Sequence, residues 1–259
     1  MINVFDVTQH YGIRPVLRHI NLAIPEGSLT AIIGPNGMGK STLLAVIAGV
    51  LTPQHGHVEV DGLRRKSSVE AELAIRRRVV YLPDRPWLPK NRTGREFLLG
   101  VGRLYDIPAD RLIDHAERLL QLFELDKLGD SPIRTYSAGQ QKKISLCSAL
   151  VTECTILLLD EPFSGGLDPS GILALKHVLG RLAHDDRGTI LMTTPVPELV
   201  DELADRLVIL RDGQVAVQGT LRDLQRETQC NGGLAEVLER LISPHTLENL
   251  DRYFAGRQS

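Results

Sequence analysis

A glycine-rich stretch, GPNGMGKST at residues 34–42, has the spacing G-x-x-x-x-G-K-[ST] of loops that bind phosphate groups. It follows an apolar run, LTAIIG, and opens a helical pattern, KSTLLAVIAGV, so it would join a buried strand to a helix. Glycines let such a loop curl until its backbone N–H groups point at phosphate oxygens, and the helix N-terminus adds partial positive charge. The residues predicted to bind phosphate are Gly34, Pro35, Asn36, Gly37, Met38, Gly39, Lys40, Ser41 and Thr42.

Two side chains in this loop have the chemistry that a nucleoside triphosphate needs. Lys40 can bridge the β- and γ-phosphates, and the Ser41 hydroxyl can bind Mg²⁺. A strand-to-helix turn that binds nothing is the alternative. The lysine, the serine and both flanking elements are all in place, which argues against it.

A second motif, TILLLDEP at residues 155–162, ends an apolar run with two carboxylates. Asp160 stands at the strand end, where a carboxylate commonly holds Mg²⁺ directly or through water. Glu161 can act as a general base towards an attacking water. In isolation the pair would be read as a solvated strand end, but the phosphate-binding loop favours a metal ligand followed by a catalytic base.

Three further segments occur in a fixed order around these motifs: YLPD at 81–84, YSAGQQKKISLCSAL at 136–150 and GGLDPSG at 165–171. Together with the two motifs, they resemble the ATP-binding cassette (ABC) family. The second segment resembles its LSGGQ signature, with Tyr136 for leucine and Ala138 for glycine. The third resembles its D-loop, and the first stands where its Q-loop would be. The resemblance covers about residues 1–220. The sequence lacks the guanine-specificity motif N/TKxD, which argues against a GTPase.

The resemblance implies an ATPase that binds ATP and Mg²⁺. In this family the signature of one subunit closes over the γ-phosphate held by the other, so ATP is buried between two cassettes in a head-to-tail dimer. A serine and small residues at a helix start suit such an anion site, although an N-capped helix with no further role is the alternative. Beyond the phosphate loop, the resemblance assigns nucleotide binding to Tyr11, Ser137, Ala138, Gly139, Gln140 and Asp168.

Tyr11 stands where an aromatic ring commonly stacks on adenine, and packing against the strand is the other reading of it. Asp84 stands where the family usually has glutamine or glutamate. Its carboxylate could reach the metal or its water, so we assign it to the catalytic and metal-binding residues. It is shorter than either, and LPDRP also has the composition of a turn.

Pro195, in TILMTTPVPEL, is the larger departure, because the family usually carries a histidine there that contacts the γ-phosphate and orients the attacking water. Proline has no side-chain donor and no backbone N–H. The phosphate-binding groups lie elsewhere, so we expect ATP binding to persist and hydrolysis to be slow. A hydroxyl from Thr193 or Thr194 is a weaker substitute, and Pro197 can begin the next helix.

Composition restricts the remaining possibilities. The 259 residues are 42% hydrophobic with a formal net charge of −2, which fits a folded domain and gives no electrostatic case for nucleic-acid binding. Three cysteines without a CxxC pair indicate buried, unpaired thiols in a reducing compartment. No signal peptide pattern or apolar run of 18 residues is present, so a membrane role would need a partner.

Five nearly continuous apolar runs are separated by helical patterns and predict an α/β fold with a parallel sheet covered on both faces. The runs predicted to be strands are LTAIIG at 29–34, RVVYL at 78–82, TILLLD at 155–160, GTILMTT at 188–194 and RLVIL at 206–210. We expect a P-loop NTPase (RecA-like) core, a helical signature subdomain at about residues 86–150 and an antiparallel β subdomain formed by Met1 to Gly27 and 56–62. The cassette would span residues 1–229, followed by a C-terminal helical tail at 230–259. We expect Lys142 and Lys143 to lie on a solvated helix face. In the stretch ADRLIDHAERLLQLFEL at 109–125, apolar residues recur at helical spacing and predict a face packed on its own lobe. These residues are Leu112, Ile113, Ala116, Leu119, Leu120 and Phe123.

The resemblance leaves three functions open. The first is the ATP-binding subunit of an ABC transporter, peripheral on the cytoplasmic face of the cell membrane, with an integral membrane permease and a second cassette as partners. The signature segment, of the form YS-x-G-x-x-KK, and the Q-loop segment, YLP followed by an acidic residue, resemble those of exporter cassettes more than those of importers. The second is a soluble ABC ATPase, although such relatives usually carry two cassettes or a coiled-coil insertion. The third is a regulatory or degenerate cassette paired with a more active one.

Overall fold

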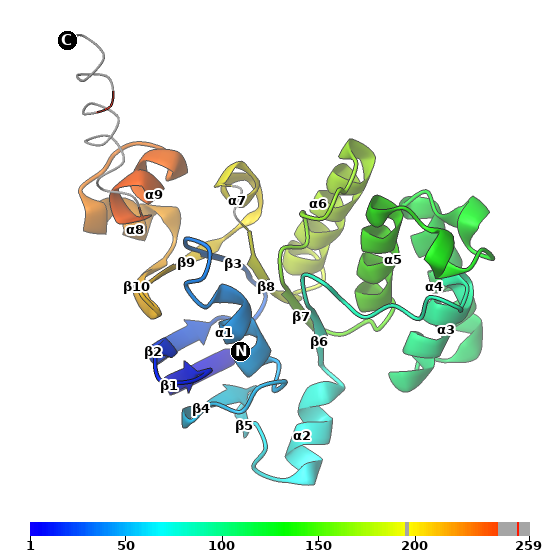
Figure 1. The fold of residues 1–259 in the computed structure, drawn as a ribbon, viewed down its shortest axis with the longest axis horizontal. Coiled ribbons are helices and arrows are strands. Elements are labelled where there is room, and N and C mark those ends of the chain that lie inside the picture. Colours follow the sequence, from blue (N-terminus) through cyan, green and yellow to red (C-terminus); the bar gives the residue numbers. More distant parts are fainter. Residues whose placement is uncertain (195–196, 243–252, 254–259) are drawn as a thin grey trace.

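The computed structural model describes residues 1–194, 197–242 and 253. Its centre is a six-stranded sheet with the order β10-β9-β3-β8-β7-β6 (Figure 1). Neighbouring strands from β9 to β6 run parallel, and β10 pairs antiparallel with β9 at one edge. The five strands predicted from apolar runs are confirmed, whereas β10 was not predicted. The strands are β3 (Leu29–Ile33), β6 (Val79–Leu82), β7 (Ile156–Leu159), β8 (Thr189–Thr193), β9 (Arg206–Arg211) and β10 (Gln214–Gly219).

A second sheet is antiparallel, with the order β2-β1-β4-β5, and it confirms the predicted antiparallel subdomain. Its strands are β1 (Ile2–His10), β2 (Pro15–Ile24), β4 (His55–Val60) and β5 (Leu63–Arg64). Helix α1 (Lys40–Ile47) shares a buried hydrophobic cluster with this sheet and with one face of the parallel sheet. The phosphate-binding segment therefore leads from the parallel sheet into the core of the antiparallel subdomain.

The other face of the parallel sheet is covered by helices, and its side chains belong to a separate core. Adjacent residues of β7 alternate between the two cores: Leu157 packs with the helices, and Leu158 packs with α1 and the antiparallel sheet. This alternation explains why the parallel strands read as continuous apolar runs, since both of their faces are buried.

Helices α3, α4 and α5 form the predicted helical lobe, at the right of Figure 1. Thr93 and Ser137 begin α3 and α5 with reciprocal capping boxes, and Pro197 begins α7 as predicted. One predicted core residue of α4 is wrong, because Ile113 is 54% exposed. The helices are α2 (Val69–Arg76), α3 (Gly94–Leu104), α4 (Ala109–Leu122), α5 (Ala138–Leu150), α6 (Pro169–His184), α7 (Pro197–Leu203), α8 (Leu221–Thr228) and α9 (Leu234–Ile242), with short 3₁₀ turns η1 (Asp126–Leu128) and η2 (Ile133–Thr135).

The predicted tail begins with helix α9, whose apolar residues Leu234, Val237 and Leu238 are buried in the helical core. Cys147, Cys154 and Cys230 are buried free thiols, as the sequence indicates. No helix in the described part of the chain has the length and apolar character of a membrane span.

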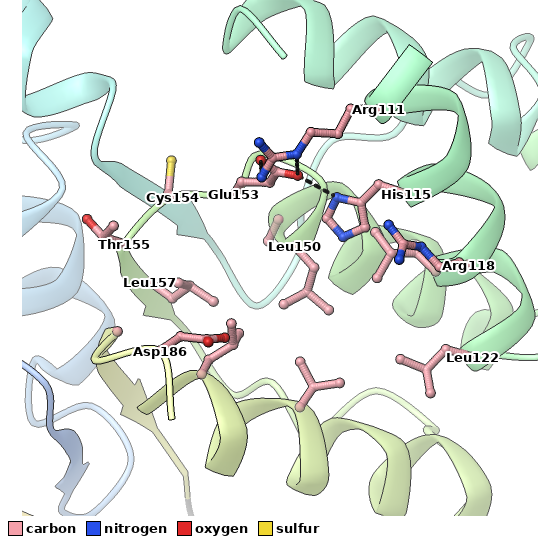
Figure 2. A pocket seen from close by; sticks show the side chains of 15 residues that line it. Arg111, His115, Arg118, Leu122, Leu150, Glu153, Cys154, Thr155, Leu157 and Asp186 are labelled. Atoms are coloured by element: carbon pink, nitrogen blue, oxygen red, sulfur yellow. Dashed lines mark hydrogen bonds and ion pairs between the residues drawn. The ribbon is translucent and has the colours of Figure 1, made fainter. Parts of the chain in front are cut away.

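A cavity of about 580 Å³ lies between the helical lobe and the parallel sheet, and Figure 2 shows the side chains around it. Glu153, in the turn that follows α5, faces two residues of α4 there. Its Oε2 lies 2.6 Å from Arg111 Nη2, and its Oε1 lies 3.2 Å from His115 Nδ1. Burial lowers the pKa of His115; Glu153 opposes this shift, and Arg118 and Arg111 add to it.

We predict that this histidine destabilises the fold in mild acid. Its pKa is lower in the folded chain than the value of about 6.5 expected in the unfolded chain. As pH falls below about 6.5, the unfolded chain therefore takes up the proton first and the free energy of unfolding decreases. Urea titrations at several pH values between 7 and 5 should show a shallower loss of stability for His115→Gln than for the wild type.

The exposed His177 provides the matched control. His177→Gln should leave the pH dependence unchanged. An equal slope in wild type and His115→Gln would contradict the assignment.

Candidate functional site

The phosphate-binding segment needs glycine at two positions for steric reasons. A Cβ atom on Gly34 would lie 2.3 Å from the carbonyl oxygen of Leu210 in β9. Gly39 is the N-cap of α1 with a φ of 93°, and a Cβ there would meet Leu17 at 2.8 Å. Both positions bring the loop backbone close to neighbouring strands, which a side chain would prevent.

Lys40 is buried at the start of α1 and folds back over the loop. Its Nζ donates to the carbonyl oxygens of Gly34 at 2.7 Å and of Pro35 at 3.0 Å. Burial lowers the pKa of Lys40, and the attraction of Glu161 and Asp160 opposes that shift. The phosphate loop and the acidic motif are thus close enough in the fold to interact electrostatically.

The phosphate loop and Lys40 have the donors and the positive charge that a nucleoside triphosphate needs. The first N–H groups of a helix have no intrahelical acceptor, and the N-cap of α1 is Gly39, which has no side chain to accept from them. These donors and the helix dipole favour an anion at this end. The ammonium of Lys40 is held within the same loop, close to where phosphate oxygens would accept its protons.

The acidic motif follows β7 and is bound to the end of the neighbouring strand β8. Thr193 Oγ1 donates to Asp160 Oδ1 at 2.6 Å and accepts from the backbone N–H of Glu161 at 2.9 Å. One hydroxyl therefore fixes the orientation of both successive acidic residues. Asp160 is buried, whereas the side chain of Glu161 is only half-buried.

The donors expected for Mg²⁺ are hard oxygen atoms, as that ion requires. The second oxygen of Asp160 is not engaged by Thr193, and Ser41 is exposed at the first turn of α1. Mg²⁺ commonly takes one or two carboxylates together with substrate phosphates. Asp160 and Ser41 remain the predicted ligands.

Asp84 follows β6 and lies beside the acidic motif. Its Oδ1 lies 3.1 Å from Ser164 Oγ and 3.9 Å from Lys142 Nζ. The serine also lies 2.9 Å from the carbonyl oxygen of Glu161. Asp84 is therefore part of the network that surrounds the expected catalytic base, and its proposed reach to the metal stays a prediction.

The signature segment begins α5. Gln140 N–H donates to Ser137 Oγ, and the Gln140 side chain accepts from Ser137 N–H. Ser137 and Ala138 are exposed at the end of the helical lobe, and Gly139 lies against the carbonyl of Gly166, which a Cβ would meet at 2.6 Å. The capping role is present, and the exposed residues also leave this end of the helix accessible.

The expectation that Lys142 and Lys143 lie on a solvated face is wrong. Both are buried, with about 5% and 4% of their surface exposed. Lys142 Nζ donates to the carbonyl oxygen of Glu161 at 2.9 Å, and Lys143 Nζ to Asp168 Oδ2 at 2.8 Å. Burial lowers the pKa of Lys142, and Asp84 is the first of the acidic groups that oppose the shift. Long aliphatic stems let these residues pack while their ammonium groups bind oxygen atoms.

Asp168 is the N-cap of α6, where its Oδ1 accepts from the Gly171 N–H at 2.8 Å. The bond from Lys143 is the main cause of its lowered pKa, and the cap adds to it. Its carboxylate is thus engaged within the chain. A contact of Asp168 with nucleotide stays a prediction.

Tyr11 is 65% exposed in the turn between β1 and β2, which fits a ring that could stack on a ligand better than one packed in the core. Pro195 lies outside the described residues. Thr194 is buried, and the hydroxyl of Thr193 is already engaged by Asp160 and Glu161.

A parallel sheet with a glycine-rich loop and an acidic pair at its carboxyl edge defines the class of P-loop nucleoside triphosphatases. The model of one family, described as ABC transporter, matches residues 17–164. The chain belongs to the ABC transporter family, as one of its ATP-binding cassettes, and is an ATPase of that family.

Two curated relatives place this match in context. The chain is 34% identical over 227 residues to the daunorubicin resistance ATP-binding protein DrrA3 of Streptomyces coeruleorubidus, which covers 88% of the chain and 70% of the relative. It is 32% identical over 250 residues to the Nod factor export ATP-binding protein I of Rhizobium meliloti (strain 1021), covering 94% and 73%.

Solved structures agree. An ATP-binding subunit of an ABC transporter superposes with a TM-score of 0.86 at 29% identity, covering 93% of the chain and 99% of that structure. A dimeric ATP-binding cassette in a post-hydrolysis state, bound to ADP and Pi, gives a TM-score of 0.77 at 27% identity, covering 86% and 99%.

Three residues of this network have roles that the sequence did not predict: Thr193, Ser164 and Lys142. The sequence named Thr193 only as a weaker substitute for the missing histidine. Its place beside Asp160 follows from the strand register, in which Leu159 pairs with Met192, and that register is seen only in the structure. Nothing in the local sequence identifies the other two, since their role depends on how α5 packs against the loop after β7.

We predict that Thr193→Val destabilises the chain by about 1–3 kcal/mol, because Asp160 loses a donor and the Glu161 N–H loses its acceptor in a buried place. Chemical denaturation measures the free energy of unfolding directly. Thr193→Ser keeps the hydroxyl and should lie much closer to the wild type. A Thr193→Val variant as stable as the wild type would refute the role assigned to this bond.

Proposed function

We propose that this cassette hydrolyses ATP with Glu161 as the general base. The observation that carries the proposal is the network in which Thr193 fixes Asp160 and Glu161 while Lys40 lies within their electrostatic reach. When bound, ATP with Mg²⁺ supplies the phosphoanhydride bond that is cleaved. The phosphate loop binds and orients the phosphates, Asp160 and Ser41 hold the metal, and Glu161 accepts a proton from water.

We propose that two cassettes associate head to tail when ATP is bound. The exposed Ser137 and Ala138 at the start of α5 leave the signature open to a second chain. One similar solved structure is a dimeric cassette with ADP and Pi. In the proposed dimer, Ser137, Gly139 and neighbouring amides of one chain, together with Tyr11 of the other, contact one nucleotide.

We further propose that the dimer drives a separate membrane permease at the cytoplasmic face of the membrane. A groove of about 590 Å³ on α3 supports this, because Trp87 and Leu104 are both 82% exposed beside it. Large apolar side chains exposed around a groove suit an apolar segment of a partner protein. We favour export, as the name of the Nod factor relative indicates for that protein.

Pro195 and Asp84 favour slow hydrolysis. They also favour a second candidate function, in which this chain is a regulatory cassette whose signature completes the nucleotide site of a more active partner. Each composite site takes its phosphate loop from one chain and its signature from the other. Gel filtration of the chain alone and with candidate partner cassettes, in the presence of ATP, distinguishes the two arrangements.

We predict that Glu161→Gln abolishes ATP hydrolysis and retains ATP. The amide cannot accept the proton from water, whereas the phosphate-binding groups are unchanged. Phosphate release should fall by about 100-fold or more, and gel filtration with ATP and Mg²⁺ should show an accumulated dimer. The exposed Glu70 gives the control, since Glu70→Gln should behave as the wild type. Hydrolysis at the wild-type rate in Glu161→Gln would show that another group is the base.

We predict that Pro195→His accelerates hydrolysis, because a missing transition-state contact commonly costs on the order of 10²–10³ in rate. The readout is kcat for phosphate release, compared with a Pro195→Ala control that removes the proline without adding a donor. A gain specific to histidine is the expected result. An unchanged or lower rate would contradict the idea that this contact alone is missing.

A further inference from the structure

The loop between β7 and α6, residues 160–168, is held against the signature helix α5 of the same chain at three points. Lys142 binds the carbonyl oxygen of Glu161 near its beginning. Gly139 abuts the carbonyl of Gly166 two residues before its end, and Lys143 binds Asp168 at its end. Two adjacent buried lysines thus hold the two ends of the segment that carries the expected catalytic base.

Lys142 makes the contact nearest to the chemistry. Its Nζ donates to the Glu161 carbonyl oxygen at 2.9 Å and lies 3.9 Å from Asp84 Oδ1. Ser164 Oγ lies within hydrogen-bond distance of the same two acceptors, at 2.9 and 3.1 Å. The ammonium therefore joins three parts of the chain: α5, the turn after β7 and the segment after β6.

The backbone of Glu161 needs such support. Its φ of 46° is in the left-handed region, which is unfavourable for a residue with a Cβ and persists where surrounding contacts enforce it. Thr193 holds the N–H of this residue, and Lys142 and the Ser164 N–H, at 3.1 Å, hold its carbonyl oxygen. A buried ammonium is itself costly unless it is paired and hydrogen-bonded, so its place here restricts how the turn can move.

We propose that Lys142 is a positioning residue for hydrolysis, which fixes the Glu161 turn and ties it to the signature helix of its own chain. The proposal rests on the proposed role of Glu161 as the base. It adds a connection between two composite sites. The start of α5 is exposed and would contact the partner's nucleotide in the proposed dimer, and Lys142 lies on the same helix.

The path along α5 from Ser137 to Lys142 is short. Lys142 is five residues after Ser137, which is about 7.5 Å along a helix axis. A displacement of α5 when a partner engages Ser137 would therefore reach the Glu161 carbonyl through one side chain. Binding at one site and water activation at the other would be coupled within a single chain.

The test compares Lys142→Met, Lys142→Arg and Lys127→Met, where Lys127 is an exposed lysine of the same lobe. Methionine keeps the buried stem and removes the ammonium. We expect Lys142→Met to lower kcat for ATP hydrolysis by roughly 10- to 100-fold, because a small misplacement of a catalytic group is enough for that loss. The KM for ATP and the Kd of a fluorescent ATP analogue should stay within about threefold of wild type, since the phosphate loop is untouched. Lys142→Arg should recover part of the rate, and Lys127→Met should match the wild type.

A second readout needs neither hydrolysis nor nucleotide. Hydrogen–deuterium exchange in peptides covering 161–166 should become roughly tenfold faster in Lys142→Met, while exchange in α1 stays unchanged. Should Lys142→Met fail to fold, Lys142→Gln provides the same comparison with a shorter, uncharged side chain.

Unchanged kcat together with unchanged exchange in 161–166 would overturn the proposal. So would a loss of kcat accompanied by an equal loss of nucleotide affinity, which marks a general structural role. Failure of the proposed function looks different: the wild type would not hydrolyse ATP, or Glu161→Gln would remain active, while the exchange experiment would still decide whether Lys142 holds the turn.

Discussion

Charge burial at the carboxyl edge of the parallel sheet is the constraint on which the rest of this structure depends. Lys40, Asp160 and Lys142 are all buried there, and Glu161 is half-buried beside them. A buried charge is tolerated only with partners of good geometry. The loop carbonyls, Thr193 and the carbonyl of Glu161 supply those partners, so the ends of the strands and the start of the signature helix have little freedom to rearrange.

Satisfying these charges also arranges the chemistry. Lys40 is held by the loop that surrounds the expected phosphate position, and the hydroxyl that orients Asp160 also holds the backbone of Glu161. Hydrogen bonds within the chain thus fix the orientation of these groups, and fixed donors and dipoles are what electrostatic catalysis requires. A solved cassette bound to ADP and Pi shares this fold.

The sequence predicted the parts of the fold that depend on local pattern. Continuous apolar runs located five strands of the main sheet, and the spacing of glycine, lysine and serine located the phosphate loop. The sequence did not predict contacts between segments that are far apart in the chain. Lysine in a helix is ordinarily solvent-exposed, and only the position of the loop after β7 shows that Lys142 and Lys143 have oxygen acceptors within reach. Ile113 failed in the opposite sense, because helical spacing does not show where the apolar face of α4 ends.

The two cores on either side of the parallel sheet have a consequence for how the family can diverge. Leu157 and Leu158 are neighbours in the chain, yet within the described residues their side chains belong to two separate clusters of buried apolar residues. Each core can therefore be repacked by substitutions at alternate positions of the same strand without disturbing the other. Substitutions at Leu157 are therefore constrained by the helical lobe, and substitutions at Leu158 by α1 and the antiparallel sheet.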